Sequence, residues 1–565
     1  MKLLLEREEV NPESQDNFGR TPLSYAAKKG SEEIAMLLLQ REEVNPESRD
    51  NSGRTPLSYA AEAYEGERVV KLLLERGEVN PESRDNSGRT PLSYVAGVSC
   101  SEGAVNLLLE RGEVNPESRD DGGRTPLSYA AECGNEEKVR MLLEQGKVNP
   151  ELRDCDGRTP LSYAAGYGSE GIVKVLLERG EVNPESRDNF GRTPLSYATG
   201  ANGDEEVVKL LLERGEVNPE SRDNSGRTPL SYATGTYGDE EVVKLLLERG
   251  EVNPESRDNS GRTPLSYATE AYGGEGVVKL LLERAEVNPE SRDNEGRTPL
   301  SYATGANGDE EIVKLLLERD EVNPESRDNS GRTPLSYATG ANGDEEVVKL
   351  LLERGEVNPE SRDNSGRTPL SYAASAPEGE GTVMLLLERE EVNPESRDNE
   401  GRTPLSYAAS AVNSEVVAKL LLEREEVNPE SRDNSGRTPL SYAASADDGE
   451  AVTKLLLERE EVNPESRDNE GRTPLSYAAE CGSEDIVKLL LQRGEVHLES
   501  RDHSGRTPLS YATGCGSEET VKLLLERGGV VPEPRDDSGQ TPPPYAPECG
   551  SEERLNSKRR RLNHG

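Results

Sequence analysis

The dipeptide Thr-Pro recurs along nearly the whole chain at intervals of 34 or 35 residues. A period of this length indicates a solenoid, in which each repeat folds against its neighbours and contacts little else. This self-similarity constrains the fold more strongly than composition does. The sixteen occurrences begin at Thr21, Thr55, Thr90, Thr125, Thr159, Thr193, Thr228, Thr263, Thr298, Thr333, Thr368, Thr403, Thr438, Thr473, Thr507 and Thr541.

Each repeat contains the signals for two short helices, as the segment 333–367 shows. Thr333 is a typical helix N-cap, and Pro334 suits the first helical position because its missing N–H would be unpaired there anyway. Asp344 and two glutamates then start a second helix, whose Val-Val-x-Leu-Leu-Leu run supplies an apolar face. We expect glycine to end this helix in many copies, before a turn-rich connector with the sequence Val-Asn-Pro-Glu-Ser-Arg-Asp-Asn-Ser-Gly-Arg.

Composition by itself would predict disorder. Only 32% of the residues are hydrophobic, Trp is absent, Phe occurs twice and the formal net charge is -42. Such a profile is typical of chains that cannot build a core. The repeat overrides it, because helix pairs that are too short to be stable alone can cover one another's apolar faces.

The recurring pattern D-x-x-G-x-T-P-L-x-x-A, followed by G, V-K-L-L-L-E and V-N, resembles the ankyrin repeat. The resemblance implies an all-α ankyrin-repeat solenoid of stacked helix-turn-helix units, joined by short hairpin-like connectors, with a concave face that binds proteins. Ser336 stands where the family's TPLH motif has His, and the repeats are slightly longer than usual. We expect altered packing around Ser336 and the bulky Tyr337 within the same fold. The array most resembles the large ankyrin arrays of filamentous fungi.

The ends of the chain do not complete a repeat. Residues 1–20 match only a second helix and connector, residues 21–540 form fifteen complete repeats, residues 541–556 are a degenerate half repeat, and residues 557–565 are a basic tail expected to be disordered. A missing polar cap at the start suggests a fragment of a longer protein. We predict a protein-protein interaction scaffold or adaptor. The alternative is the ligand-recognition arm of a larger NACHT/STAND-type signalling receptor whose N-terminal domain is missing.

Little in the sequence favours catalysis. Of the three histidines, His497 and His503 replace asparagines of the connector and His564 lies in the basic tail. No metalloprotease, P-loop, dinucleotide-binding or EF-hand motif occurs. Carboxylates recur in every repeat, whereas a single active site would not. We therefore predict no enzymatic activity, no cofactor and no metal site.

The segment after Tyr-Ala, between the two helices, varies strongly among otherwise similar repeats. In the ankyrin family this region and the connector tips border the binding surface, and exposed aromatic side chains are favoured contacts. Drift in a tolerant turn explains the variation equally well. The regular tyrosines, such as Tyr232 and Tyr267, are expected to pack within the repeat. The candidate partner-binding residues are Phe18, Tyr64, Tyr167, Phe190, Tyr237 and Tyr272.

The acidic charge is spread over all the repeats, so we expect a protein partner with a basic surface and no nucleic acid, whose phosphates the array would repel. No segment is long and apolar enough to cross a membrane. The six cysteines are scattered and include no CxxC pair, which indicates thiols in a reducing compartment. We predict a monomer in the cytoplasm. A basic run could direct it to the nucleus or simply solubilise the tail: Lys558, Arg559, Arg560 and Arg561.

Replacing Tyr237 and Tyr272 together is expected to weaken binding of a partner that maps to these repeats without lowering the unfolding midpoint. The reason is that both side chains lie outside the regular tyrosine position of the repeat. Affinity measurements paired with thermal unfolding of the same variant check this. Unchanged affinity would reject the assignment.

Overall fold

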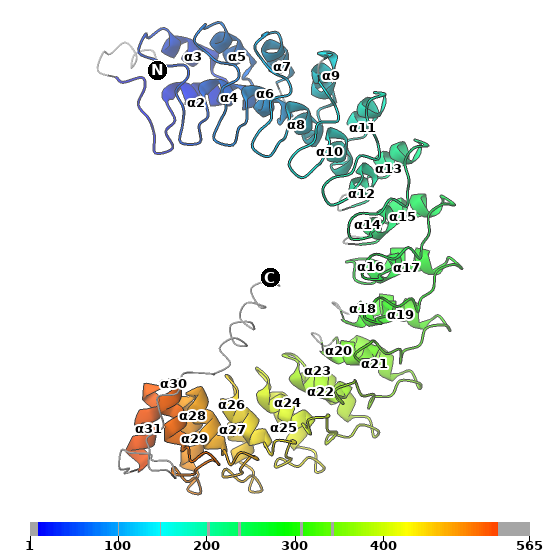
Figure 1. Ribbon diagram of the computed structural model, residues 1–565, viewed down its shortest axis with the longest axis vertical. Coiled ribbons are helices and arrows are strands. Elements are labelled where there is room, and N and C mark those ends of the chain that lie inside the picture. Colours follow the sequence, from blue (N-terminus) through cyan, green and yellow to red (C-terminus); the bar gives the residue numbers. More distant parts are fainter. Residues whose placement is uncertain are drawn as a thin grey trace. The chain divides into compact units, whose positions relative to one another are not determined.

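The computed structural model describes residues 10–99, 101–146, 148–200, 204–235, 239–305, 309–340 and 344–528. These residues form thirty α-helices and no strand, which confirms the all-helical fold predicted from the repeat. The helices follow one another in pairs along the chain (Figure 1). They fall into two compact units, Met1–Asn288 and Pro289–Gly565.

The first helix of each repeat starts at the proline of Thr-Pro. In the first unit these helices are α2 (Pro22–Lys28), α4 (Pro56–Glu62), α6 (Pro91–Ala96), α8 (Pro126–Cys133), α10 (Pro160–Gly166), α12 (Pro194–Ala198), α14 (Pro229–Ala233) and α16 (Pro264–Ala268). In the second unit they are α18 (Pro299–Gly305), α20 (Pro334–Gly340), α22 (Pro369–Ser375), α24 (Pro404–Ser410), α26 (Pro439–Ser445), α28 (Pro474–Cys481) and α30 (Pro508–Cys515).

The second helix of each repeat starts at a glutamate. In the first unit these helices are α3 (Glu32–Leu39), α5 (Glu67–Leu74), α7 (Glu102–Leu109), α9 (Glu136–Glu144), α11 (Glu170–Leu177), α13 (Glu205–Leu212), α15 (Glu240–Leu247) and α17 (Glu275–Leu282). In the second unit they are α19 (Glu310–Leu317), α21 (Glu345–Leu352), α23 (Glu380–Leu387), α25 (Glu415–Leu422), α27 (Glu450–Leu457), α29 (Glu484–Gln492) and α31 (Glu518–Gly528).

Thr and Ser fix the start of the first helix by binding each other, as α10 shows. Thr159 has an extended backbone, and its Oγ1 accepts a hydrogen bond from the backbone N–H of Ser162 at 3.3 Å. The Ser162 hydroxyl accepts the backbone N–H of Thr159 at 3.4 Å in return, which completes a capping box. Ser therefore satisfies the helix start at the position where the family motif has His.

The buried faces of the second helices form a core that continues from repeat to repeat. In α5, Val69, Val70, Leu73 and Leu74 are buried, and Leu72 is half-buried. The helix packs between α3 and α7, the second helices of the repeats on either side. First helices pack on first helices in the same way, as α4 does on α2 and α6. Each repeat thus completes its neighbours' core and has no closed core of its own.

The second helix ends earlier than the sequence predicts. The sequence predicts a glycine end, but α11 ends at Leu177, and Gly180 does not adopt the positive φ of a helix-ending glycine. An arginine of the next repeat satisfies a carbonyl at the end of the helix instead. The Arg214 guanidinium, for example, donates to the carbonyl oxygen of Leu177 at the end of α11. The helix end is therefore set by a contact between repeats.

Carboxylates and a glycine join the connectors of successive repeats. Glu47 accepts the backbone N–H of Asn80 at 3.0 Å and the hydroxyl of Ser83 at 2.6 Å. Gly53 has a φ of 78°, and a Cβ at this position would lie 2.8 Å from the backbone nitrogen of Asn86 in the next connector. Glycine is required there by both its backbone and its close neighbour.

The substitution Leu73→Ala should lower the local free energy of unfolding by about 2–5 kcal/mol, because Leu73 is fully buried between α3 and α7. The matched substitution Leu72→Ala, one residue away in the same helix, should lower it by less than about 1.5 kcal/mol because Leu72 is half-buried. Hydrogen exchange of the α5 amides measures both effects locally in a long array. Equal loss of protection in the two variants would contradict this packing.

Candidate binding surface

In most repeats, one buried aspartate ties the connector to the first helix. The Asp154 side chain is 1% exposed, and its Oδ1 accepts the backbone N–H groups of Asp156 at 2.9 Å and Arg158 at 2.8 Å. Its Oδ2 accepts the Arg158 Nε–H at 2.8 Å and the Tyr163 hydroxyl at 2.7 Å. The Arg158 guanidinium also lies over the Tyr163 ring, 4.8 Å from its centroid. The regular tyrosine therefore packs within the repeat.

This environment shifts the pKa of both acids in opposite directions. Burial by itself would raise the pKa of the Asp154 carboxyl, but hydrogen bonds from Tyr163 and Arg158 outweigh burial and hold that pKa below its usual value. Burial and the hydrogen bond to Asp50 raise the pKa of Tyr59, the equivalent tyrosine of an earlier repeat, to about 12. Folding thus stabilises a charged carboxylate beside a neutral phenol, an arrangement that holds the repeat together.

The described candidate tyrosines lie in the turns that follow a first helix, and all are exposed. The exposed fractions of Tyr64 and Tyr272 are 82% and 83%, and that of Tyr167 is 57%. The Tyr167 hydroxyl donates to Glu132 of the preceding repeat at 3.1 Å, which holds the ring in place. The remaining candidate tyrosine, Tyr237, lies outside the described residues. These turns therefore present aromatic rings to solvent.

The two candidate phenylalanines lie at the opposite end of the first helix, in the connectors that precede α2 and α12. Phe18 and Phe190 are 64% and 56% exposed. Arg20 and Arg192 stack on their rings, at 4.6 Å and 5.0 Å from the ring centroids. The five described candidates therefore form two sets, tyrosines beyond the C-terminal end of the first helices and phenylalanines before the N-terminal end. The basic run 558–561 lies outside the described residues.

The model of the family described as ankyrin repeats (3 copies) matches overlapping segments that together extend over residues 1–536. The chain belongs to the ankyrin-repeat family. Ankyrin repeats bind protein partners and are typically interaction modules without enzymatic activity. No curated protein matches the chain in a sequence search. The matched segments are residues 1–85, 63–154, 97–186, 146–223, 180–256, 201–293, 271–361, 306–398, 340–433, 375–468, 417–502 and 446–536.

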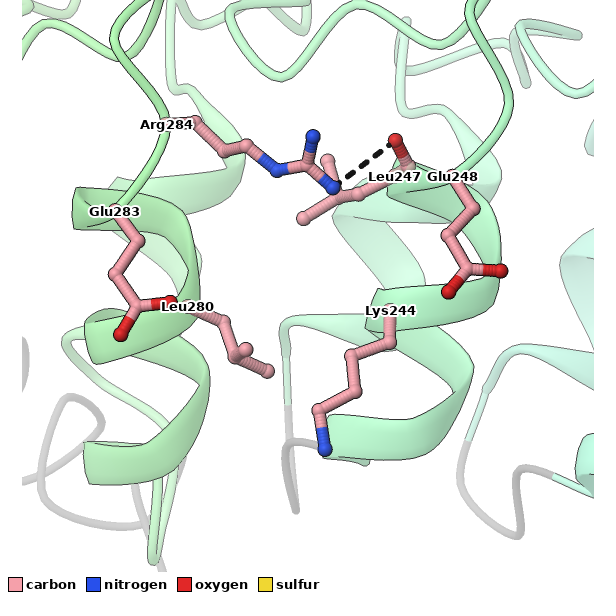
Figure 2. Close-up of a pocket in the computed structure, with 6 residues that line it drawn as sticks. All are labelled: Lys244, Leu247, Glu248, Leu280, Glu283 and Arg284. Carbon is pink, nitrogen blue, oxygen red and sulfur yellow. Dashed lines mark hydrogen bonds between the residues drawn. The ribbon is translucent and has the colours of Figure 1, made fainter.

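Furrows lie between neighbouring second helices of the ankyrin array. The furrow between α15 and α17 has a volume of about 310 Å³ and is lined by Lys244, Leu247, Glu248, Leu280, Glu283 and Arg284 (Figure 2). Across it, Arg284 donates to the carbonyl oxygen of Leu247 at 3.2 Å. Six residues of the same types line a furrow of about 340 Å³ between α19 and α21. A furrow that recurs with the repeat follows from stacking and does not mark a single active site.

Two further findings bear on the kind of site this array can offer. Within the described ranges, no group of three or more His, Cys, Asp or Glu side chains is arranged to hold a metal ion. The helices of the same ranges are too short or too polar to cross a membrane.

The sequence-based candidates omit several residues that the structure makes conspicuous. Met384, Val412 and Val416 are 48%, 42% and 41% exposed. Lys138 stands where most repeats have Val or Ile, and it is fully buried with its Nζ donating to the carbonyl oxygens of Val95 at 2.6 Å and Val98 at 2.5 Å. A position-by-position alignment of the repeats with one another is the signal that would find these residues, because each departs from the regular residue at its position.

The buried tyrosines should stay protonated in the folded array at a pH where free tyrosine ionises. Because the pKa of Tyr59 is raised from 10.0 to about 12, this group's contribution to stability is complete below about pH 10 and is lost as the pH rises to about 12. Ultraviolet absorbance at about pH 11 should show far less phenolate in the folded chain than in the chain unfolded by urea. Circular dichroism at the same pH verifies that the helices persist. Equal phenolate in folded and unfolded chains would contradict the proposed burial.

Proposed function

We propose that this ankyrin array is a protein-interaction scaffold whose partner contacts the exposed aromatic side chains in the turns after the first helices. The observation that carries the proposal is a contrast within one repeat. Tyr59 is 5% exposed and its hydroxyl donates to Asp50 at 2.5 Å, whereas Tyr64, five residues later, is 82% exposed. The first tyrosine is explained by folding. The second is not needed by the fold, and tyrosine is enriched among the residues that dominate binding energy at interfaces.

Charge supports a partner with a basic surface. The net charge of -42 is distributed over the repeats, and much of it lies on exposed glutamates at the starts of the second helices, such as Glu240 and Glu241. A basic partner would be attracted at long range and would approach faster at low ionic strength. Cys155 and Cys515 are free thiols, which supports the cytoplasm as the proposed location.

The double substitution Tyr64→Ala, Tyr272→Ala should weaken capture of partners by about tenfold or more, since truncating an interface tyrosine commonly removes at least about 1 kcal/mol. The intact chain serves as bait, mass spectrometry identifies the captured proteins, and their affinities are then measured with purified components. Helix content should be unchanged, because both side chains are largely exposed.

The matched control is Tyr59→Phe, which lies in the same repeat as Tyr64. It removes a buried hydrogen bond and should lower local stability by about 1–2 kcal/mol, yet leave affinity unchanged. Wild-type affinity in the double variant would rule out the tyrosines as the contact surface. Weaker binding by Tyr59→Phe alone would show that affinity depends on repeat stability instead.

A further inference from the structure

A pocket of about 500 Å³ in the second unit differs in chemistry from the regular furrows. It lies over the first turns of α23 and α25 and the turns that precede them. Its lining includes the apolar side chains of Met384 and Val416 and the carboxylates of Glu345, Glu378 and Glu380.

Two substitutions relative to neighbouring repeats create the apolar part. Met384 occupies the position of Lys349 and Lys419 in the repeats on either side, and Val416 occupies the position of Glu346. Met384 and Val416 are 48% and 41% exposed. Thus the repeats that meet here replace charged side chains with apolar ones on the same patch, although the regular residues at these positions are compatible with the fold.

The Met384 substitution leaves Glu380 without its usual counter-charge. In α19, Lys314 pairs with Glu310 and with Glu311, the latter at 2.9 Å. Met384 cannot pair in this way with Glu380, the residue equivalent to Glu310. Within the part of the chain that the structure describes, no ion pair includes Glu345, Glu378 or Glu380, and Lys349, four residues after Glu345 in α21, pairs with Glu346 at 3.7 Å.

The pocket beside Met384 differs from the regular furrows in the balance of acidic and basic residues in its lining. The furrows between α15 and α17 and between α19 and α21 are each lined by two acidic and two basic residues. The pocket beside Met384 has three glutamates and no basic residue in its lining. It therefore combines exposed apolar surface with uncompensated negative charge.

The absence of a side chain at Gly381 lets the Glu345 carboxylate lie against α23 in the lining of the pocket. Gly381 stands where Glu311 and Glu346 lie in the two preceding repeats, and a Cβ at Gly381 would collide with Oε1 of Glu345. The Glu345 carboxylate thus lies against the first turn of α23, at Gly381, three residues before Met384. A positively charged group entering along Met384 would meet this carboxylate.

We propose that this pocket binds a lysine or arginine side chain from a basic segment of a partner protein, a refinement that rests on the proposed role in protein binding. The aliphatic stem of such a side chain packs on Met384 and Val416, and its charged end pairs with the glutamates of the pocket lining. A purely apolar ligand would leave the three carboxylates unpaired, and an anionic ligand would be repelled. The combination of an aliphatic stem and a positive charge fits both halves of the pocket.

The test measures fluorescence anisotropy of a short labelled peptide, in which two lysines are separated by leucine, against the full-length chain. Met384→Lys should weaken binding by about tenfold. The new lysine offsets the negative charge of the lining glutamates and removes the apolar side chain of Met384. It also restores the residue found at the same position in the adjacent repeats, so the fold should be retained. Glu458→Gln, at an exposed site outside the pocket, changes the net charge by the same one unit and should bind the peptide as the wild type does.

The variant Val416→Glu distinguishes binding in the pocket from general electrostatic attraction between the acidic chain and the basic peptide. This variant is more acidic than the wild type, so general attraction predicts tighter binding. The pocket predicts weaker binding, by about fivefold, because apolar contact with the lysine stem is lost. The same peptide with acetylated lysines should bind poorly to the wild type.

Three outcomes would overturn the proposal: no saturable binding to the wild type, equal binding by Met384→Lys, or tighter binding by Val416→Glu. Tyr64 and Tyr272 are unchanged in all these variants. Failure of the pocket therefore leaves the proposed function intact, whereas wild-type affinity of the double tyrosine variant would contradict that function.

Discussion

The helices of this protein are too short to be stable in isolation, and the rest of the structure depends on that constraint. The first helices have as few as five residues, as in α12, and most second helices have eight, as in α5. Helices of this length are unstable in water, so their stability must come from packing. Leu73 is fully buried only because α3 and α7 lie on either side of α5. A chain that is only 32% hydrophobic can fold this way because each apolar side chain serves two repeats.

A second requirement is that the connectors, which have no strand in the described ranges, be held in a fixed shape. The buried aspartate meets it by gathering backbone N–H groups, an arginine and a tyrosine hydroxyl at one point, as Asp154 does. This explains why a bulky tyrosine recurs so regularly: its ring covers the arginine and its hydroxyl completes the carboxylate. A buried charge of this kind is tolerated because all of its oxygen atoms are hydrogen-bonded.

The near-identity of the repeats limits which side chains can select a binding partner. A side chain that recurs in every repeat is explained by folding, as Tyr59 is, and cannot by itself select one partner. Selectivity must come from positions that depart from the regular residue, and the exposed departures are concentrated near the turns between the two helices. Tyr64 and Tyr272 add aromatic surface there, while Met384 and Val416 replace charge with apolar surface. The acidic background attracts a basic partner, and these departures provide the specific contacts.

The sequence by itself determined the repeat, the positions of both helices and the Thr-Pro helix start, because these depend on hydrogen bonds and apolar spacing within a few residues. It also indicated that the tyrosines after Ala differ from the regular ones. Tertiary structure alone decided that, in repeats such as that of α11, an arginine of the next repeat satisfies a carbonyl at the end of the second helix. It also brought Met384 together with Val416 and Glu345. Those residues are more than thirty positions apart in the sequence, and only the stacking of one repeat on the next makes them neighbours.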